Sequence, residues 1–279
     1  MLYASVSTRS VERREATELE DQDLAVSAIR ERLSAKSNAV LLQLQTRLDR
    51  ILLGWLSVAA LACAARIALT PLQTFGVDVV LPYLLLVLAP AMSVVLALRW
   101  FRDGDGLPQP RTRLATLGRW QPVDRDHAQR HRLYGANGIM VSLLVGMLLN
   151  VPVRAAEYLA AMPALSGSVP PWLSTLHLLM TVDVVIFPSL YAIAFVAALR
   201  RVPLFPRLLA AIWLGDIGMQ LLTADLVAAT PGLPSTVAGA LHALLDGNVK
   251  KVLISVALWL PYLLLSERVN VTYRHRIAA

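Results

Sequence analysis

Charged and amide side chains recur inside stretches of the chain that are otherwise apolar. Asn150, Arg154 and Glu157 are four and three residues apart, so on a helix they share one face. Asp216, Gln220 and Thr223 show the same spacing in a later stretch. Ionisable groups within a membrane-spanning helix are costly and mark ion pathways, substrate sites or structural ion pairs. These residues are therefore the first candidates for a functional site.

Two aspartates, Asp183 and Asp216, lie at comparable depth near the middle of their stretches. The basic residues of these stretches lie toward the outer ends of their helices, where acidic residues could meet them: Arg66, Arg154, Lys250 and Lys251, with Glu157 and Asp225. Arg154 can also pair with Glu157 on its own helix. The two aspartates are therefore expected to lack a cationic partner, and such a carboxyl in a low dielectric is expected to be neutral. They could share a proton, bind a cation, or only accept hydrogen bonds between helices.

Catalytic and cofactor motifs are missing from the sequence. It contains no Gly-x-Ser-x-Gly, no His-Glu-x-x-His and no glycine-rich phosphate loop. The single cysteine, Cys63, excludes an internal disulfide and a multi-cysteine metal site. We therefore expect no catalytic residue, no metal site and no cofactor.

Six apolar stretches must position the polar residues. Each is close to the ~20 residues that a helix needs to cross a bilayer, where the backbone must satisfy its own hydrogen bonds. They cover residues 51–69, 79–98, 135–162, 173–199, 208–229 and 249–265. Hydrophobic residues make up 56% of the chain and charged residues 16%, against about 25% in a globular domain. The sequence predicts an all-α, polytopic membrane helix bundle.

The basic residues alternate between the connections. Arginines precede the first stretch, fill the loop 99–134 between the second and third, separate the fourth and fifth, and follow the sixth. The connections around 73–78, 163–171 and 231–248 contain no Lys or Arg. This positive-inside pattern predicts cytoplasmic termini and contact with the anionic cytoplasmic leaflet. The basic residues behind the net charge of +7 are therefore expected to face lipid phosphates, and nucleic-acid binding is not expected.

Residues 1–50 form a charged leader ahead of the membrane domain, which we place at 51–279. Leu19, Val26, Leu33 and Val40 recur every seven residues among acidic and basic side chains. The pattern predicts a cytoplasmic amphipathic helix, but polar residues at intervening positions specify a coiled coil only weakly. The helix could lie along the membrane or protein surface, or bind a protein partner.

The last stretch and its exit resemble the end of a bacterial inner-membrane family, domain of unknown function 2569. The residues that carry the resemblance are Trp259, Pro261, Tyr262, Ser266, Arg268, Thr272 and Tyr273, with Gly54, Trp55 and Leu56 in the first stretch. That family commonly has four helices, whereas six are expected here. The resemblance implies a helical fold and a bacterial inner-membrane location, and it implies no activity.

Three functions are compatible with these features. The first is a non-enzymatic accessory or assembly partner of an envelope system, with the leader and the basic loop as interaction surfaces. The second is a small proton- or ion-coupled transporter that uses Asp183 and Asp216. The third is an integral-membrane enzyme acting on a lipid or lipid-linked substrate.

Overall fold

The computed structural model describes residues 32, 35–71, 75–111 and 118–279. Six of its helices are long and apolar enough to cross a membrane: α2 (Leu48–Leu69), α3 (Val77–Trp100), α5 (Ile139–Ala161), α6 (Pro171–Leu199), α7 (Phe205–Ala228) and α8 (Ser235–Leu265). The short elements are η1 (Gly104–Gly106), β1 (Trp120–Pro122), α4 (Arg125–Arg130), α9 (Glu267–Arg274) and β2 (Arg276–Ala278). The predicted all-α membrane bundle is confirmed.

Proline marks several helix starts, because its missing N–H costs nothing in a first turn. Pro171 opens α6, Pro206 lies in the first turn of α7, and Pro234 directly precedes α8. The observed helices include the predicted stretches to within a few residues, apart from the last. Residues 235–248, predicted as a connection, instead form the first turns of α8. That part of the prediction is wrong.

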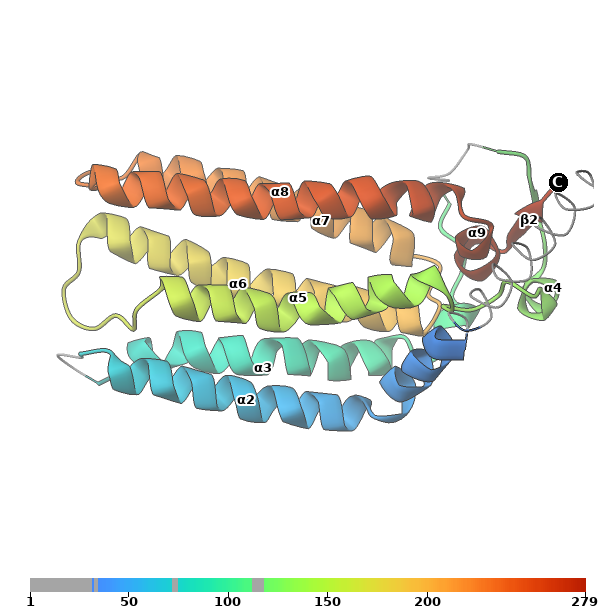
Figure 1. Cartoon of the computed structure of the whole chain (residues 1–279), viewed down its shortest axis with the longest axis horizontal. Helices are drawn as coiled ribbons and strands as arrows, with labels where there is room; N and C mark the ends of the chain where they lie inside the picture. Colours follow the sequence, from blue (N-terminus) through green and yellow to red (C-terminus); the bar gives the residue numbers. More distant parts are fainter. Residues whose placement is uncertain (1–31, 33–34, 72–74, 112–117) are drawn as a thin grey trace, which may run out of the picture.

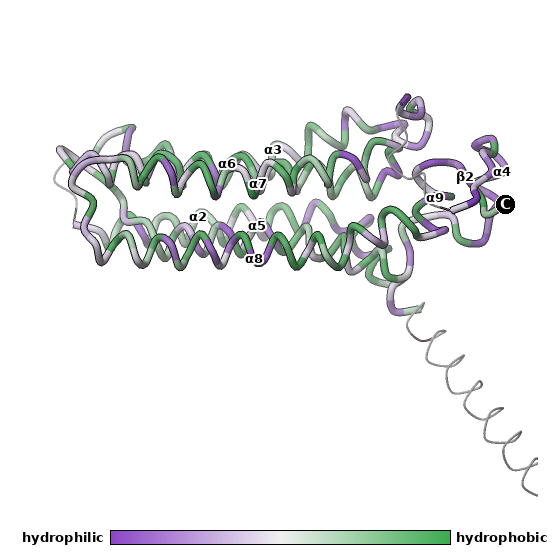
Figure 2. Tube along the Cα trace, turned by 90° about the horizontal axis from the view of Figure 1, so that it is seen from above, coloured by the Kyte–Doolittle hydropathy of each residue, from purple (hydrophilic) through white to green (hydrophobic). Residues whose placement is uncertain are grey.

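The six long helices form two layers of three (Figure 1, Figure 2). One layer holds α3, α6 and α7, and the other holds α2, α5 and α8. Helix α6 is central, since it packs on α3, α5 and α7. In its most apolar 18 residues, 67% of the residues are buried. The corresponding share is 11% in α2 and in α8, so these two helices present most of their surface to the surroundings.

The two ends of the bundle differ (Figure 1). At the hairpin end lie the direct connections α2–α3, α5–α6 and α7–α8. At the capped end, α4, α9 and the antiparallel pair β1–β2 cover the helix termini. The predicted basic loop 99–134 supplies η1, β1 and α4 to this cap.

Most of the leader lies outside the described residues, including three of the four heptad positions noted above. Within the described part, residues 35–46 are helical and join α2 through a bend at Arg47. Ser37 in this segment accepts a hydrogen bond from the Gly138 N–H at 3.2 Å, at the start of α5. This end of the leader therefore contacts the membrane domain.

Candidate functional site

A polar layer separates two apolar cores within the bundle. One core includes Phe187 and Trp213 toward the capped end, and the other includes Tyr158 and Val184 toward the hairpin end. The polar layer, as we name it, consists of Arg154 on α5, Asp183 on α6, and Asp216 and Gln220 on α7. Three helices thus converge on one buried group of charges.

Arg154 binds both aspartates at once. Its Nη1 donates to Asp183 Oδ2 at 2.8 Å, and its Nη2 donates to both Asp216 carboxyl oxygens at 2.5 Å. The Arg154 and Asp183 side chains are 10% and 11% exposed, and Asp216 is fully buried. The guanidinium also lies 5.4 Å from the centre of the Phe187 ring. The planar fork of arginine suits this geometry, because a lysine ammonium presents a single point charge.

The prediction that Asp183 and Asp216 lack a cationic partner is wrong. The sequence places Arg154 several residues nearer the hairpin end, but a helical side chain leans toward the N-terminus of its own helix. Helix α5 begins at the capped end, so the long Arg154 side chain extends back toward the depth of the aspartates. Glu157 does not pair with Arg154; it pairs instead with Lys251 on α8.

Amide side chains link the polar layer to helix α8. Gln220 Nε2 donates to Asp183 Oδ1 at 2.9 Å, and its Oε1 accepts from Asn248 Nδ2 at 3.3 Å. Lys251 Nζ in turn donates to Asn248 Oδ1 at 3.3 Å. A continuous chain of polar contacts therefore runs from the buried carboxyls to a lysine whose side chain is 59% exposed.

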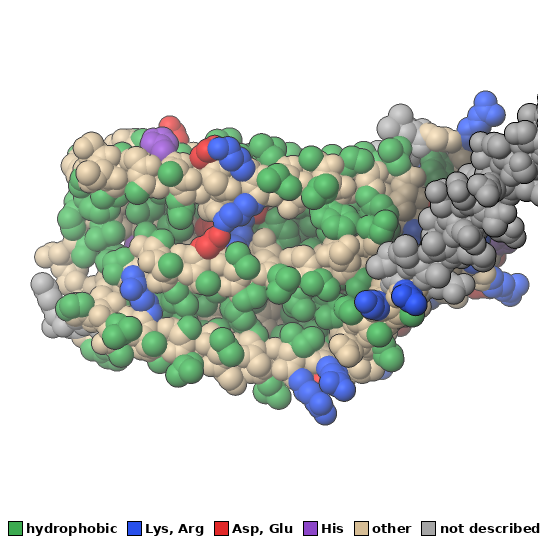
Figure 3. Space-filling view, in the orientation of Figure 1, with side chains coloured by type: hydrophobic (Ala, Val, Ile, Leu, Met, Phe, Trp, Pro, Cys, Tyr) green, Lys and Arg blue, Asp and Glu red, His purple; other side chains and the backbone are tan. Residues whose placement is uncertain are grey.

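The chain of contacts ends at a cleft between α5 and α8. Helix α5 packs on α6 and α2, whereas α8 packs mainly on α7. A cavity of about 60 Å³ between α5 and α8 is lined by Asn150, Arg154, Tyr191 and Asn248, among others. It is large enough for water, and the buried Asn150 Oδ1 on its wall has no hydrogen-bond partner among the described residues. Figure 3 shows charged side chains in the otherwise apolar face over α5 and α8.

The structure brings together most of the predicted intramembrane residues. Asp183, Asp216, Gln220 and Arg154 form the polar layer, while Asn150 and Glu157 line the cleft beside it. Arg66 lies elsewhere, where its Nε donates to the Met162 carbonyl oxygen at 3.1 Å.

Sequence reasoning missed two members of the network. Tyr191 donates to Asp216 Oδ2 at 3.0 Å, and Asn248 links Gln220 to Lys251. Lys251 was expected near Glu157, which it contacts, but not as part of a path to the carboxyls. One signal for Tyr191 was its position two helical turns after Asp183 on α6, which places the two side chains on one face. Asn248 was passed over because it was assigned to a connection.

The family-like residues at the end of the chain fasten the cap. Arg268 Nη1 donates to the Leu133 carbonyl oxygen at 3.1 Å, and Thr272 Oγ1 accepts from the Gly135 N–H at 3.0 Å. Tyr273 is buried and donates from its hydroxyl to the Ala198 carbonyl oxygen at 2.9 Å. Residues of α9 thus hold both the segment before α5 and the end of α6.

The remaining family-like residues lie in or beside the long helices. Trp55 Nε1 donates to the Val87 carbonyl oxygen at 3.0 Å. Its sequence neighbours are Leu56 and Gly54, and a Cβ added at Gly54 would meet nothing within 4 Å. Trp259 and Tyr262 pack edge to face with ring centres 6.0 Å apart, on either side of Pro261 in sequence. Ser266 separates α8 from α9, and its backbone N–H donates to the Tyr262 carbonyl oxygen.

Across residues 35–71, 75–111 and 118–279, no three His, Cys, Asp or Glu side chains are grouped so that they could hold a metal ion. No family model, curated protein or solved structure matches this chain.

Proposed function

We propose that this integral membrane protein is a small proton- or ion-coupled carrier whose coupling site is the polar layer. The observation that carries the proposal is that one buried guanidinium, Arg154, is shared by carboxyls from two different helices, Asp183 and Asp216. Intramembrane groups of this kind are expensive to bury and are found on ion and substrate pathways.

The charge balance of the polar layer supports uptake of one cation. Arg154 compensates one carboxylate, so the layer carries one excess negative charge when both aspartates are ionised. Uncompensated charge in a low dielectric is unfavourable, and a bound proton or monovalent cation would remove it. Loading and unloading would change how tightly Arg154 holds α6 and α7 together.

The cleft between α5 and α8 offers a path to this site. Its polar walls and the Gln220–Asn248–Lys251 contacts lead from the exposed face to the buried carboxyls. Because α5 and α8 pack mainly on other helices, a change in their separation would disturb few existing contacts. Such relative movement of packed helices is a common basis for alternating access.

Proton or cation flux in proteoliposomes tests the proposal. Liposomes that contain the purified protein and a trapped pH-sensitive dye should show flux driven by an imposed gradient, and Asp216→Asn should abolish it at unchanged protein content. Asp246→Asn is the matched control, because Asp246 is exposed on α8 and pairs with Lys250. No flux by the wild-type protein under pH, Na⁺ or K⁺ gradients, or equal flux by both variants, would contradict the proposal.

A second candidate, an accessory or assembly partner of an envelope system, is favoured by charges on the outer surface of α8. Lys251 lies about 21 Å along the helix from Leu265, at a depth where lipid chains are expected. Its side chain and those of Asp246 and Lys250 are more than half exposed. A partner helix covering this face would shield them. Crosslinking from Lys250→Cys in native membranes should then capture one defined protein, and lipid adducts alone would refute this candidate.

We further propose that the protein resides in a bacterial inner membrane with its capped end in the cytoplasm, in contact with anionic lipids. The alternating arginines support this orientation, and the resemblance of the α8–α9 segment to the bacterial family supports the location. Residues 1–50 would then be accessible to cytoplasmic partners.

A further inference from the structure

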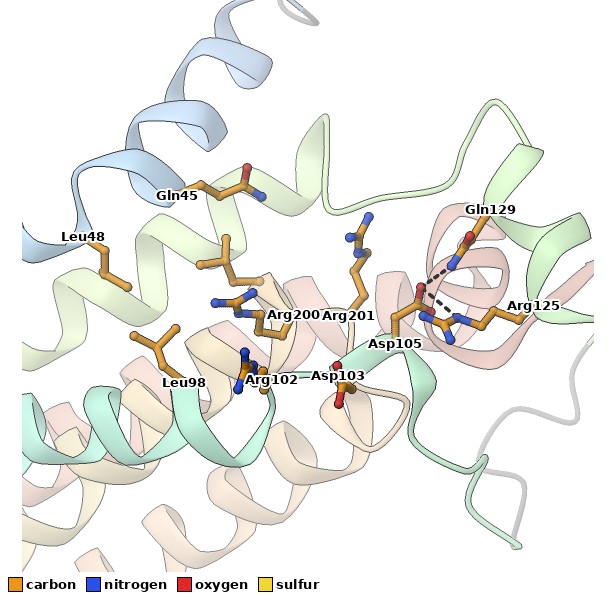
Figure 4. Close-up of a pocket in the computed structure, with 12 residues that line it drawn as sticks. Gln45, Leu48, Leu98, Arg102, Asp103, Asp105, Arg125, Gln129, Arg200 and Arg201 are labelled. Atoms are coloured by element: carbon orange, nitrogen blue, oxygen red, sulfur yellow. Dashed lines mark hydrogen bonds and ion pairs between the residues drawn. The ribbon is translucent and has the colours of Figure 1, made fainter.

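A second polar cavity lies at the capped end, well away from the polar layer. It has a volume of about 500 Å³ and lies between the helical segment 35–46, the ends of α3 and α6, and α4 (Figure 4). One wall is apolar and belongs to the membrane helices; it consists of Leu48, Leu98 and Leu199. The rest of the lining is polar and comes from the residues that follow α3 and α6, from η1 and α4 in the cap, and from Gln45 of the helical segment.

Four arginines line this cavity: Arg102, Arg125, Arg200 and Arg201. Arg125 is engaged by Asp105, at 3.4 Å from Nε to Oδ2. Arg201 lies 5.2 Å from the centre of the Tyr134 ring, and its buried Nε has no hydrogen-bond partner among the described residues. Arg102 and Arg200 are exposed and have no ion-pair partner within the described part of the chain.

The backbone around these arginines is tightly fixed. A Cβ added at Gly104 would lie 2.5 Å from the Arg200 carbonyl oxygen, so only glycine allows η1 to approach the end of α6 this closely. Arg201 adopts a left-handed conformation with φ of 58°, which a non-glycine residue holds only when its surroundings compensate the cost. The arginine backbones are therefore positioned before any ligand arrives.

Asp105 belongs to this scaffold and leaves little negative charge for the cavity. It is buried, accepts a hydrogen bond from Gln129 Nε2 at 2.6 Å, and faces Arg125 and His275. Burial opposes its ionisation, but the nearby Tyr134 hydroxyl, Gln129 and the arginine charges outweigh burial and lower its pKa. Asp105 Oδ2 thus already has an amide and an arginine partner within the protein, while the buried Oδ1 faces His275 and has no hydrogen bond among the described residues.

The net charge of the cavity wall favours an anion. Four arginines against Asp103 and Asp105 leave an excess of two positive charges. The C-terminal ends of α3 and α6 contribute roughly −0.5 each, so about one positive charge remains uncompensated. Arginine is suited to phosphate, which it binds through paired N–H groups.

We propose that this cavity binds a phosphate-bearing anion, with Arg102 and Arg200 as its principal ligands and Arg201 as a third donor. The phosphate can come from the headgroup of an anionic phospholipid, since the apolar wall is formed by the ends of the long apolar helices α2, α3 and α6, or from a soluble phosphate compound. Both sources share the same chemistry at the arginines.

Two binding measurements on the full-length protein test the inference and separate the sources. Native mass spectrometry counts phosphatidylglycerol retained against phosphatidylcholine, and thermophoresis at constant ionic strength measures the Kd for inorganic phosphate. The test variant is Arg102→Gln/Arg200→Gln. The control, Arg99→Gln/Arg130→Gln, removes two exposed arginines from the same end of the protein outside the cavity. Arg102→Lys/Arg200→Lys keeps the charge, and melting temperatures confirm folding.

We expect the test variant to bind at least about tenfold more weakly, and the control to change by less than about twofold. The lysine variant should lie between them, because it keeps charge but loses paired donors. Loss confined to phosphatidylglycerol identifies a lipid headgroup, and loss confined to inorganic phosphate identifies a soluble ligand. Equal weakening in test and control variants, or no binding of either probe by the wild-type protein, would overturn the proposal.

Discussion

Replacing Arg154 by leucine should strongly destabilise the membrane domain. The change removes the contacts to Asp183 at 2.8 Å and to both Asp216 oxygens at 2.5 Å. Among the residues that the structure describes, Asp216 then keeps the hydroxyl of Tyr191 at 3.0 Å and a long contact to Gln220 at 3.5 Å. Breaking a buried ion pair by removing one partner costs about 3–5 kcal/mol, and we expect a loss in this range. Arg154→Lys should cost about 1.5–3 kcal/mol, because one ammonium cannot reach both carboxyls in the same geometry.

The free energy of unfolding, measured by denaturant titration with tryptophan fluorescence, gives the values. Arg130→Leu serves as control and should change the free energy by less than about 1 kcal/mol, since Arg130 is exposed on α4 in the cap, outside the long helices. Adding Asp183→Asn and Asp216→Asn to Arg154→Leu should restore much of the loss, because no charge is then left unpaired. A loss no larger than in the control, or no recovery in the triple variant, would refute the reasoning.

Three further predictions follow from the same contacts. Asp183→Asn and Asp216→Asn should each change the free energy of unfolding by no more than about 1 kcal/mol, because the other aspartate still pairs with Arg154. The double variant should unfold more easily, since the guanidinium then loses both partners. Thermal melts of all three variants decide this. Asp105→Asn should destabilise the cap at neutral pH. Because folding lowers the pKa of Asp105, the difference in stability between variant and wild type should shrink as pH falls below about 3.9. Equal differences in stability at neutral and acidic pH would contradict this prediction. In intact spheroplasts, a membrane-impermeant thiol reagent should label a cysteine introduced at Ser168 but not one at Asp126; the reverse pattern would invert the orientation.

The long helices could be predicted from hydropathy alone, because a continuous apolar run of about 20 residues satisfies its backbone within lipid as a helix. The first turns of α8 were missed because His242, Asp246 and Asn248 lower the hydropathy of residues 235–248. Yet Leu241 and Leu245 are buried one turn apart in this segment, which is the spacing of a helix that packs on a neighbour. The long-range pairing of β1 with β2 left no signal in either three-residue strand.

The candidate site was predicted in its residues but not in its contacts. Asp183, Asp216, Gln220 and Arg154 were all singled out, because a charge inside an apolar stretch is visible in the sequence. Their partners were not, since helix tilt and the reach of the Arg154 side chain determine which charges meet. The cavity at the capped end joins segments distant in sequence, so spacing alone could not reveal it.

The central claim is that the polar layer takes up one proton or cation at the carboxyls held by Arg154. Infrared difference spectroscopy of the reconstituted protein, recorded on changing pH or on exchanging Na⁺ or K⁺, observes carboxyl groups directly. We predict a carboxyl signal that is present in the wild-type protein and in Asp246→Asn and is lost in Asp183→Asn or Asp216→Asn. A spectrum that responds to neither pH nor cations, or that is unchanged in both of the latter variants, would contradict the claim.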